Sequence, residues 1–232
     1  MNNKIFKVLL VFTLVVTLSG CSLETEAEKV LSLTKNGATS FDQQKLEQVL
    51  ERKKEMQKPL GEEVEMDLIY LIEEEKVARD LSYKFSQKYD EKIFTEVYKA
   101  ENTHLKAVQR FIRNYKLDDP TSKNGVGEFK NPQLQKIYDE KLSSGKENKN
   151  KAYQSLLWVL EKNINDININ KDSTDKDDIL FVYNNLIRSS KNHIRAIDSL
   201  LSKEGGSYSP EHLSKAKYES IISSDIDSGS WW

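Results

Sequence analysis

The 232-residue sequence predicts an all-α fold. From about Glu63 to Leu201, apolar residues recur at spacings of three and four, which is the period of helices buried on one face. No alternating apolar and polar run of strand type has any length in this region, and the whole chain contains only nine glycines and four prolines. These observations favour a single helical domain attached to a short N-terminal segment.

Four long helices follow from this pattern, and a short one lies between the second and the third. The link near Asp90 is so short that the first two helices must form an antiparallel hairpin. Asp119-Pro120 and Asn124-Gly125 mark a loop, and Asn131-Pro132 is typical of the start of a short helix. The expected long helices are Glu63–Tyr89, Lys92–Tyr115, Asn148–Asn163 and Asp175–Leu201, and the short one ends near Leu142. Two hairpins joined by one long crossover are the layout of a ferritin-like four-helix bundle.

The N-terminal residues resemble a bacterial lipoprotein signal peptide. Lys4 and Lys7 precede an apolar run from Val8 to Leu18, and Ser19-Gly20 lead to Cys21, the single cysteine. The run is shorter than the ~20 residues that a transmembrane helix needs. We therefore expect cleavage before Cys21, lipidation of its thiol, and anchoring to a membrane on the exported side of the bacterial cell envelope. A free cysteine in a leader is the alternative interpretation.

The predicted organisation is a signal peptide at 1–20, a tether at 21–61, a bundle at 62–222 and a tail at 223–232. We expect little fixed structure from Ser22 to about Ser40, and then a short amphipathic helix from Phe41 to Met56. The stretch after Leu201 should pack back along the bundle. A net charge of −2 without a basic stripe argues against a nucleic-acid partner. The sequence does not indicate a protein partner or an oligomeric state.

Several polar residues fall on the apolar faces of the predicted helices. Glu75 lies seven residues after Leu68 and three before Ala78, so it points along the buried face, whereas Glu73 should point to solvent and Glu74 should lie at the edge. The run Glu73-Glu74-Glu75-Lys76 is also consistent with an ordinary solvated surface.

The second, third and fourth helices add further candidates. Glu101 and His104 are three residues apart and project toward one point, as ligands do in carboxylate-bridged metal bundles, although His104 is also consistent with a hydrogen-bonded core histidine. His193 faces inward beside Ala196, and Glu161 is the candidate on the third helix. The predicted metal ligands are thus Glu75, Glu101, His104, Glu161 and His193. Three carboxylates with two imidazoles suit iron or manganese and, less specifically, zinc.

Three runs in this order resemble a bacterial ferritin-like family known as domain of unknown function 2202. They are Glu73-Glu74-Glu75-Lys76-Val77-Ala78-Arg79-Asp80, Glu101-Asn102-Thr103-His104 and Ser189-Ser190-Lys191-Asn192-His193-Ile194-Arg195-Ala196. The resemblance covers roughly Glu63 to Ile222 and implies a ferritin-like fold but no activity. Glu75 followed by Ala78-Arg79 is also similar to the first-helix ligand motif of rubrerythrins.

The sequence departs from that pattern at two places. Ser190 stands where di-iron proteins carry the glutamate of a second Glu-x-x-His pair, and Leu160, Glu161 and Asn163 leave one acid on the third helix where the family tends to carry more. One metal ion, or a site of altered geometry, is therefore the better expectation.

Two hypotheses of different classes follow. In the first, a lipid-anchored bundle binds iron or manganese and supports oxidation of Fe(II) by oxygen or peroxide, in metal handling or oxidative-stress protection. In the second, the bundle is a non-catalytic scaffold or interaction lipoprotein, and its buried acids are satisfied by Arg79, by Arg195 or by hydrogen bonds; both arginines lie outside the ligand set. The sequence does not decide whether the protein is an enzyme.

Overall fold

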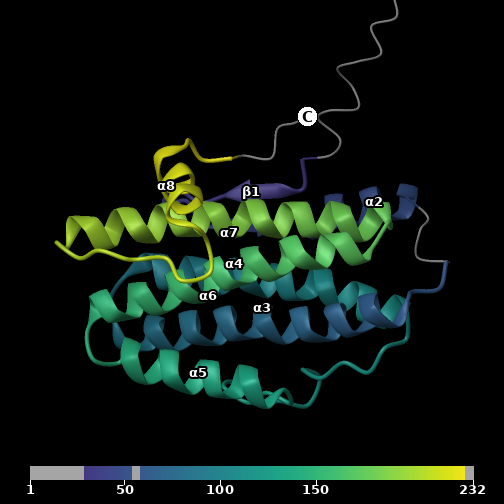
Figure 1. Cartoon of the computed structure of the whole chain (residues 1–232), viewed down its shortest axis with the longest axis horizontal. Helices are drawn as coiled ribbons and strands as arrows, with labels where there is room; N and C mark the ends of the chain where they lie inside the picture. Colours follow the sequence, from purple (N-terminus) through teal and green to yellow (C-terminus); the bar gives the residue numbers. More distant parts are fainter. Residues whose placement is uncertain (1–28, 54–57, 228–232) are drawn as a thin grey trace, which may run out of the picture.

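Four long helices packed side by side form the body of the protein (Figure 1). The structure is a computed structural model that describes residues 29–53 and 58–227. Helix α3 packs against α4 and α6, and α7 packs against α6 and α4. The long helices are α3 (Glu62–Lys88), α4 (Lys92–Asn114), α6 (Lys149–Asn170) and α7 (Asp177–Lys203). The predicted helical fold is confirmed, and α6 continues past its predicted end at Asn163 because buried Ile164 and Ile167 extend its apolar face.

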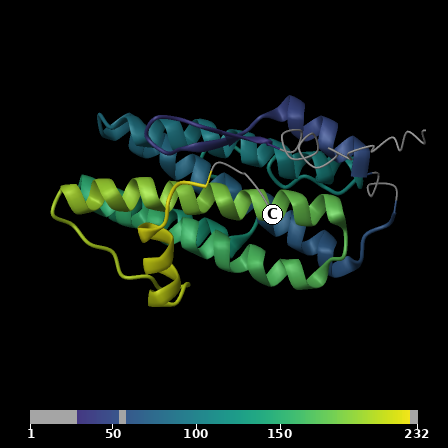
Figure 2. The same ribbon diagram turned by 90° about the horizontal axis from the view of Figure 1, so that it is seen from above.

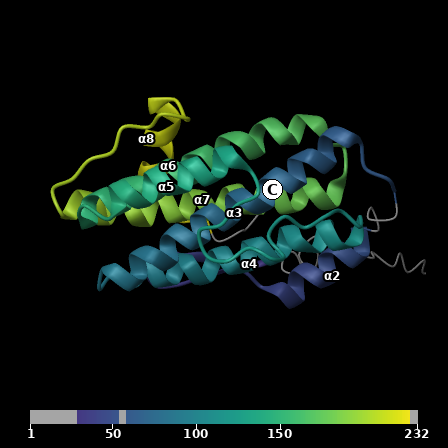
Figure 3. The ribbon, with the colours of Figure 1, turned by 90° about the horizontal axis from the view of Figure 1, so that it is seen from below.

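The crossover from α4 to α6 covers one side of these helices. It contains the predicted short helix, α5 (Pro132–Gly145), which packs against α3 and α6 (Figure 3). The Asn131 side chain caps α5 by accepting hydrogen bonds from two backbone N–H groups of its first turn. The loop before α5 lies over α3, where the Lys76 ammonium donates to the carbonyls of Gly125 and Glu128.

This loop overturns one prediction. Glu73, expected to point to solvent, is only 2% exposed, and its carboxylate accepts hydrogen bonds from the backbone N–H groups of Lys130 and Asn131 at 2.6 and 3.0 Å. Helix phase alone identified the side of α3 that faces the other long helices. It could not show that a loop from the crossover buries the opposite side.

A β-hairpin covers the other side of the bundle, across α4 and α7 (Figures 1 and 2). Strand β1 (Leu31–Leu33) pairs antiparallel with β2 (Thr39–Phe41), and α2 (Gln43–Lys53) follows directly. Gly37 makes the turn with a φ of +91°, a conformation that favours glycine. The expectation of little fixed structure up to Ser40 is therefore wrong for residues 29–40, because apolar residues such as Val30 and Ala38 are buried against the helices.

The C-terminal stretch returns along the bundle as expected. A 3-10 turn, η2 (Lys171–Ser173), links α6 to α7, and α8 (Lys215–Ser223) packs against α7. Within the described part of the chain, none of the helices combines the length and apolar character that crossing a membrane requires. Cys21, the predicted signal peptide and Trp231-Trp232 lie outside the described residues.

Candidate metal centre

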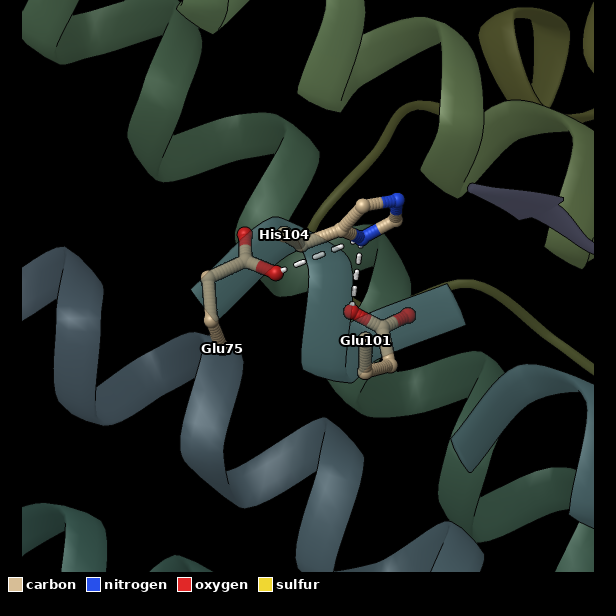
Figure 4. Close-up of side chains that lie close together, drawn as sticks. All are labelled: Glu75, Glu101 and His104. Carbon is tan, nitrogen blue, oxygen red and sulfur yellow. Dashed lines mark hydrogen bonds and ion pairs between the residues drawn. The ribbon is translucent and has the colours of Figure 1, made fainter. Parts of the chain in front are cut away.

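Three ionisable side chains meet in the core between α3 and α4 (Figure 4). Glu75 comes from α3, and Glu101 and His104 come from successive turns of α4; each is at most 1% exposed. Residues three apart on a helix share a face, so the Glu101–His104 spacing aims both groups at the carboxylate of Glu75. One ligand atom from each residue lies within 4.8 Å of the others, which is close enough for one metal ion.

The contacts inside this group are short and uneven. His104 Nδ1 lies 2.8 Å from Glu101 Oε2 and 3.6 Å from Glu75 Oε2. The second distance exceeds a hydrogen bond, and the other oxygen of Glu75, Oε1, is buried without a hydrogen-bond partner. A buried polar atom left in this state costs about 1–3 kcal/mol, so the arrangement calls for a further electropositive partner.

His193, from α7, completes the group on the far side of Glu101. Its Nδ1 lies 3.0 Å from Glu101 Oε1, and its ring stacks on that of His104 with centroids 5.6 Å apart. Glu101 is therefore held between two imidazoles. The structure thus brings together four of the five sequence-predicted ligands: Glu75, Glu101, His104 and His193.

Glu161, the fifth predicted ligand, is used elsewhere. Its carboxylate accepts hydrogen bonds from the Tyr208 hydroxyl at 2.5 Å and from the backbone N–H groups of Glu211 and Leu213. These contacts attach the C-terminal stretch to α6. Helix phase correctly predicted that Glu161 is buried, but the tail, and not the Glu75 cluster, provides its partners.

The two arginines expected near the cluster bind other groups. Arg79 pairs with Asp80 at 2.6 Å, and Arg195 donates to Asn192 and Ser224. Arg79 thus pairs with a buried acid, but with Asp80 and not with Glu75 or Glu101 of the cluster. Glu74, expected at the edge of the apolar face, is 1% exposed and pairs with Lys162 of α6 at 2.6 Å.

Burial and proximity perturb the protonation of the cluster in opposite directions. Burial is the largest influence on Glu75 and raises its pKa to about 7. Burial alone would lower the pKa of His104, but the charge and hydrogen bond of Glu101, aided by Glu75, raise it to about 10. Burial would likewise raise the pKa of Glu101, yet the two imidazoles hold it well below its ordinary value. The group therefore holds a negative charge on Glu101 beside a positive one on His104.

Thr39 of β2 was missed by sequence reasoning. Its backbone N–H donates to His193 Nε2, and its carbonyl accepts from His104 Nε2, both at 2.9 Å. The hairpin therefore contacts the outer nitrogen of each histidine. A sequence signal for this hairpin does exist. Asn36-Gly37 is a favoured hairpin turn, and it lies between one short candidate strand with Leu31 and Leu33 and another that ends at Phe41.

The fold and this site define a mostly helical protein with a buried glutamate–histidine group that can hold a metal ion. The chain belongs to the family described as an uncharacterized protein domain, DUF2202, whose model matches residues 64–225. It is 34% identical over 171 residues to the uncharacterized protein MJ0754 of Methanocaldococcus jannaschii, covering 74% of this chain and 92% of that protein. The crystal structure of hypothetical protein MJ0754 from Methanococcus jannaschii superposes with a TM-score of 0.71, at 34% identity, over 73% of this chain and 97% of that one.

Proposed function

We propose that this protein is a ferritin-like bundle that binds iron or manganese through Glu75, Glu101 and His104. The observation that carries the proposal is the buried triad itself, in which Glu75 Oε1 has no partner although it is enclosed in the core. The arrangement of two helical hairpins joined by a long crossover supports the ferritin-like assignment.

The donor set fits such a metal. Two carboxylates and one imidazole are ligands that iron and manganese accept, and three protein ligands leave further coordination positions open. With Glu161 bound to the tail and Ser190 at the position of a second acid on α7, the ligands within the described residues support one metal ion better than two.

The residues of the chain would hold the ligands and exclude water. His104 is oriented by its hydrogen bond to the Thr39 carbonyl, and Glu101 by the His193 ring, so neither ligand has to be ordered when the metal arrives. Ala100 and Val108, which flank the ligands along α4, are fully buried. A bound iron or manganese ion would supply one-electron redox chemistry, which suits oxidation of Fe(II) by oxygen or peroxide in metal handling or oxidative-stress protection.

The proposal places this chemistry at the bacterial cell envelope, anchored by lipid at Cys21. It rests on the signal-like sequence that ends at Leu18-Ser19-Gly20-Cys21. Labelling a bacterial culture with a radioactive fatty acid should label the wild-type protein and leave Cys21→Ser unlabelled. Equal labelling of both proteins, or labelling of neither, would reject the anchor without touching the metal proposal.

Metal analysis of the full chain, purified without a polyhistidine tag, tests the metal proposal. We expect about one iron or manganese per chain in the wild type and loss of that metal in Glu101→Ala and His104→Ala. Glu161→Gln is the matched control, because Glu161 is an equally buried carboxylate that the structure places outside the cluster. A well-folded wild type that neither contains iron or manganese nor takes up either ion anaerobically would overturn the proposal.

A further inference from the structure

We propose that the β-hairpin, residues 30–42, assigns different roles to the two buried histidines: His104 is a metal ligand through Nδ1, whereas His193 is a positioning residue that orients Glu101 and does not ligate. This inference rests on the proposed metal site and deepens it. The backbone of one residue, Thr39, makes both assignments.

Backbone groups have a fixed hydrogen-bonding polarity. A backbone N–H can only donate, so His193 Nε2, which lies 2.9 Å from the Thr39 nitrogen, must accept and carries no proton. In a neutral imidazole the proton then resides on Nδ1, where it is donated to Glu101 Oε1 at 3.0 Å. His193 therefore directs an N–H toward the cluster and has no lone pair on that nitrogen to offer a metal.

The ring of His104 has the opposite arrangement at Nε2. A carbonyl can only accept, so His104 Nε2 carries a proton and donates it to the Thr39 oxygen at 2.9 Å. Nδ1 then faces Glu101 and Glu75, and it is the ring nitrogen at which a metal ion can replace the proton. Metal-binding histidines usually donate their other ring N–H to a carbonyl or carboxylate in this way.

The hairpin is built to hold Thr39 in this position. Strand β2 pairs with β1 on one edge, so the N–H and C=O of Thr39 on the other edge are available to the helices. The Thr39 hydroxyl accepts from the Asn192 amide at 3.0 Å, and the Phe41 N–H donates to the Thr103 hydroxyl at 2.8 Å. Because an added Cβ at Gly37 would lie 3.1 Å from Ala196 Cβ, the turn also approaches α7 closely.

The test is nitrogen-15 NMR of the full-length chain with labelled histidine, first without metal and then with Zn(II) as a diamagnetic probe. Without metal, we expect His193 to carry its proton on Nδ1 and His104 to carry one on Nε2. With Zn(II), the Nδ1 resonance of His104 should show coordination while His193 keeps its Nδ1 proton. An Nε2–H tautomer for His193, or Zn(II) bound to its Nδ1, would overturn the inference.

Binding measurements separate positioning from ligation. Zn(II) affinity, measured by competition with a chromogenic chelator, should fall roughly 10- to 100-fold in His193→Ala, the cost typical of removing a residue that orients a ligand. His193→Asn should restore most of the affinity, since the asparagine amide places an N–H near the position of imidazole Nδ1. Equal losses in the alanine and asparagine variants would refute the positioning role.

Two hairpin variants test the part played by Thr39. Gly37→Ala combines a strained φ with a close contact to Ala196 and should lower Zn(II) affinity with all ligands intact. Lys35→Ala, at an exposed position of the same turn, is the control and should leave the affinity nearly unchanged. Gly37→Ala with unchanged affinity and unchanged tautomers would refute the role of the hairpin. If the wild type binds no Zn(II), the proposed metal site fails, while the metal-free tautomers still test the assignment.

Discussion

Glu73 and Glu75 lie two residues apart on α3 and are almost equally buried, yet replacing each by leucine should change stability in opposite directions. Metal-free Glu75→Leu should be more stable than the wild type, because it removes a buried oxygen, Oε1, that has no partner. Glu73→Leu should be less stable, because it leaves the N–H groups of Lys130 and Asn131 without their acceptor.

The magnitudes follow from these contacts. An unsatisfied buried group costs about 1–3 kcal/mol, so Glu75→Leu should raise the free energy of unfolding by up to that amount. Little is lost in exchange, because the 3.6 Å approach of Glu75 to His104 is longer than a hydrogen bond and Glu101 remains. Glu73→Leu removes two hydrogen bonds to a charged group, each worth ~1.5–3 kcal/mol, so it should cost about 3 kcal/mol or more.

Thermal unfolding followed by circular dichroism, with a chelator present, measures both changes. For a chain of this size, 1 kcal/mol corresponds to roughly 2–4 °C in Tm, so Glu75→Leu should melt several degrees higher and Glu73→Leu about ten degrees lower. At a free metal concentration 100 times Kd, the wild type should gain about 2.7 kcal/mol and Glu75→Leu almost none. A metal-free Glu75→Leu that melts below the wild type would show that Glu75 is a structural residue and refute this reasoning.

Three further outcomes are expected. Lys162→Met leaves the buried Glu74 carboxylate without its cation and should lower the free energy of unfolding by about 3–5 kcal/mol. Glu74→Gln should lower it much less, and urea titrations of the two variants would show whether this asymmetry exists. Gly145→Ala would place a Cβ 2.2 Å from the buried Phe85 ring and should cost about 1–3 kcal/mol in the same assay, and an unchanged midpoint would contradict the packing. Burial raises the pKa of Tyr153 to about 12, so its neutral form is favoured in the folded state. The resulting stabilisation is present below the unfolded pKa of about 10 and should be lost as the pH rises from 10 to 12. The unfolding free energy of Tyr153→Phe should therefore decline less steeply than that of the wild type over this range.

Helix phase accounts for most of what the sequence predicted correctly. The three- and four-residue spacings predict the long helices and the faces they bury. Charged residues are rarely buried, so those that fall on these faces are candidates for a functional site. Glu75, Glu101, His104 and His193 were found in this way, because all of them point from a regular helix into the core that the helices share.

The partners of buried polar groups come from segments distant in the sequence, and helical periodicity does not predict which segments these are. Helix periodicity correctly predicts that Glu161 is buried, but its carboxylate accepts a hydrogen bond from Tyr208 in the C-terminal stretch. Glu73 was placed outside, because nothing local shows that the loop at Lys130 folds over α3. Thr39 was overlooked because a strand of three residues has too little alternation to stand out, although the Asn36-Gly37 turn beside it does.

The position of Thr39 in the chain has a kinetic consequence. It contacts partners 65 and 154 residues away, and such distant contacts form late because long loops must close first. The helices can thus pair before the hairpin docks, and the hairpin can detach locally without unfolding the helices. Deuterium would replace the amide proton of Thr39 through this local opening, so the exchange rate of that one amide would report how often the hairpin leaves the two histidines.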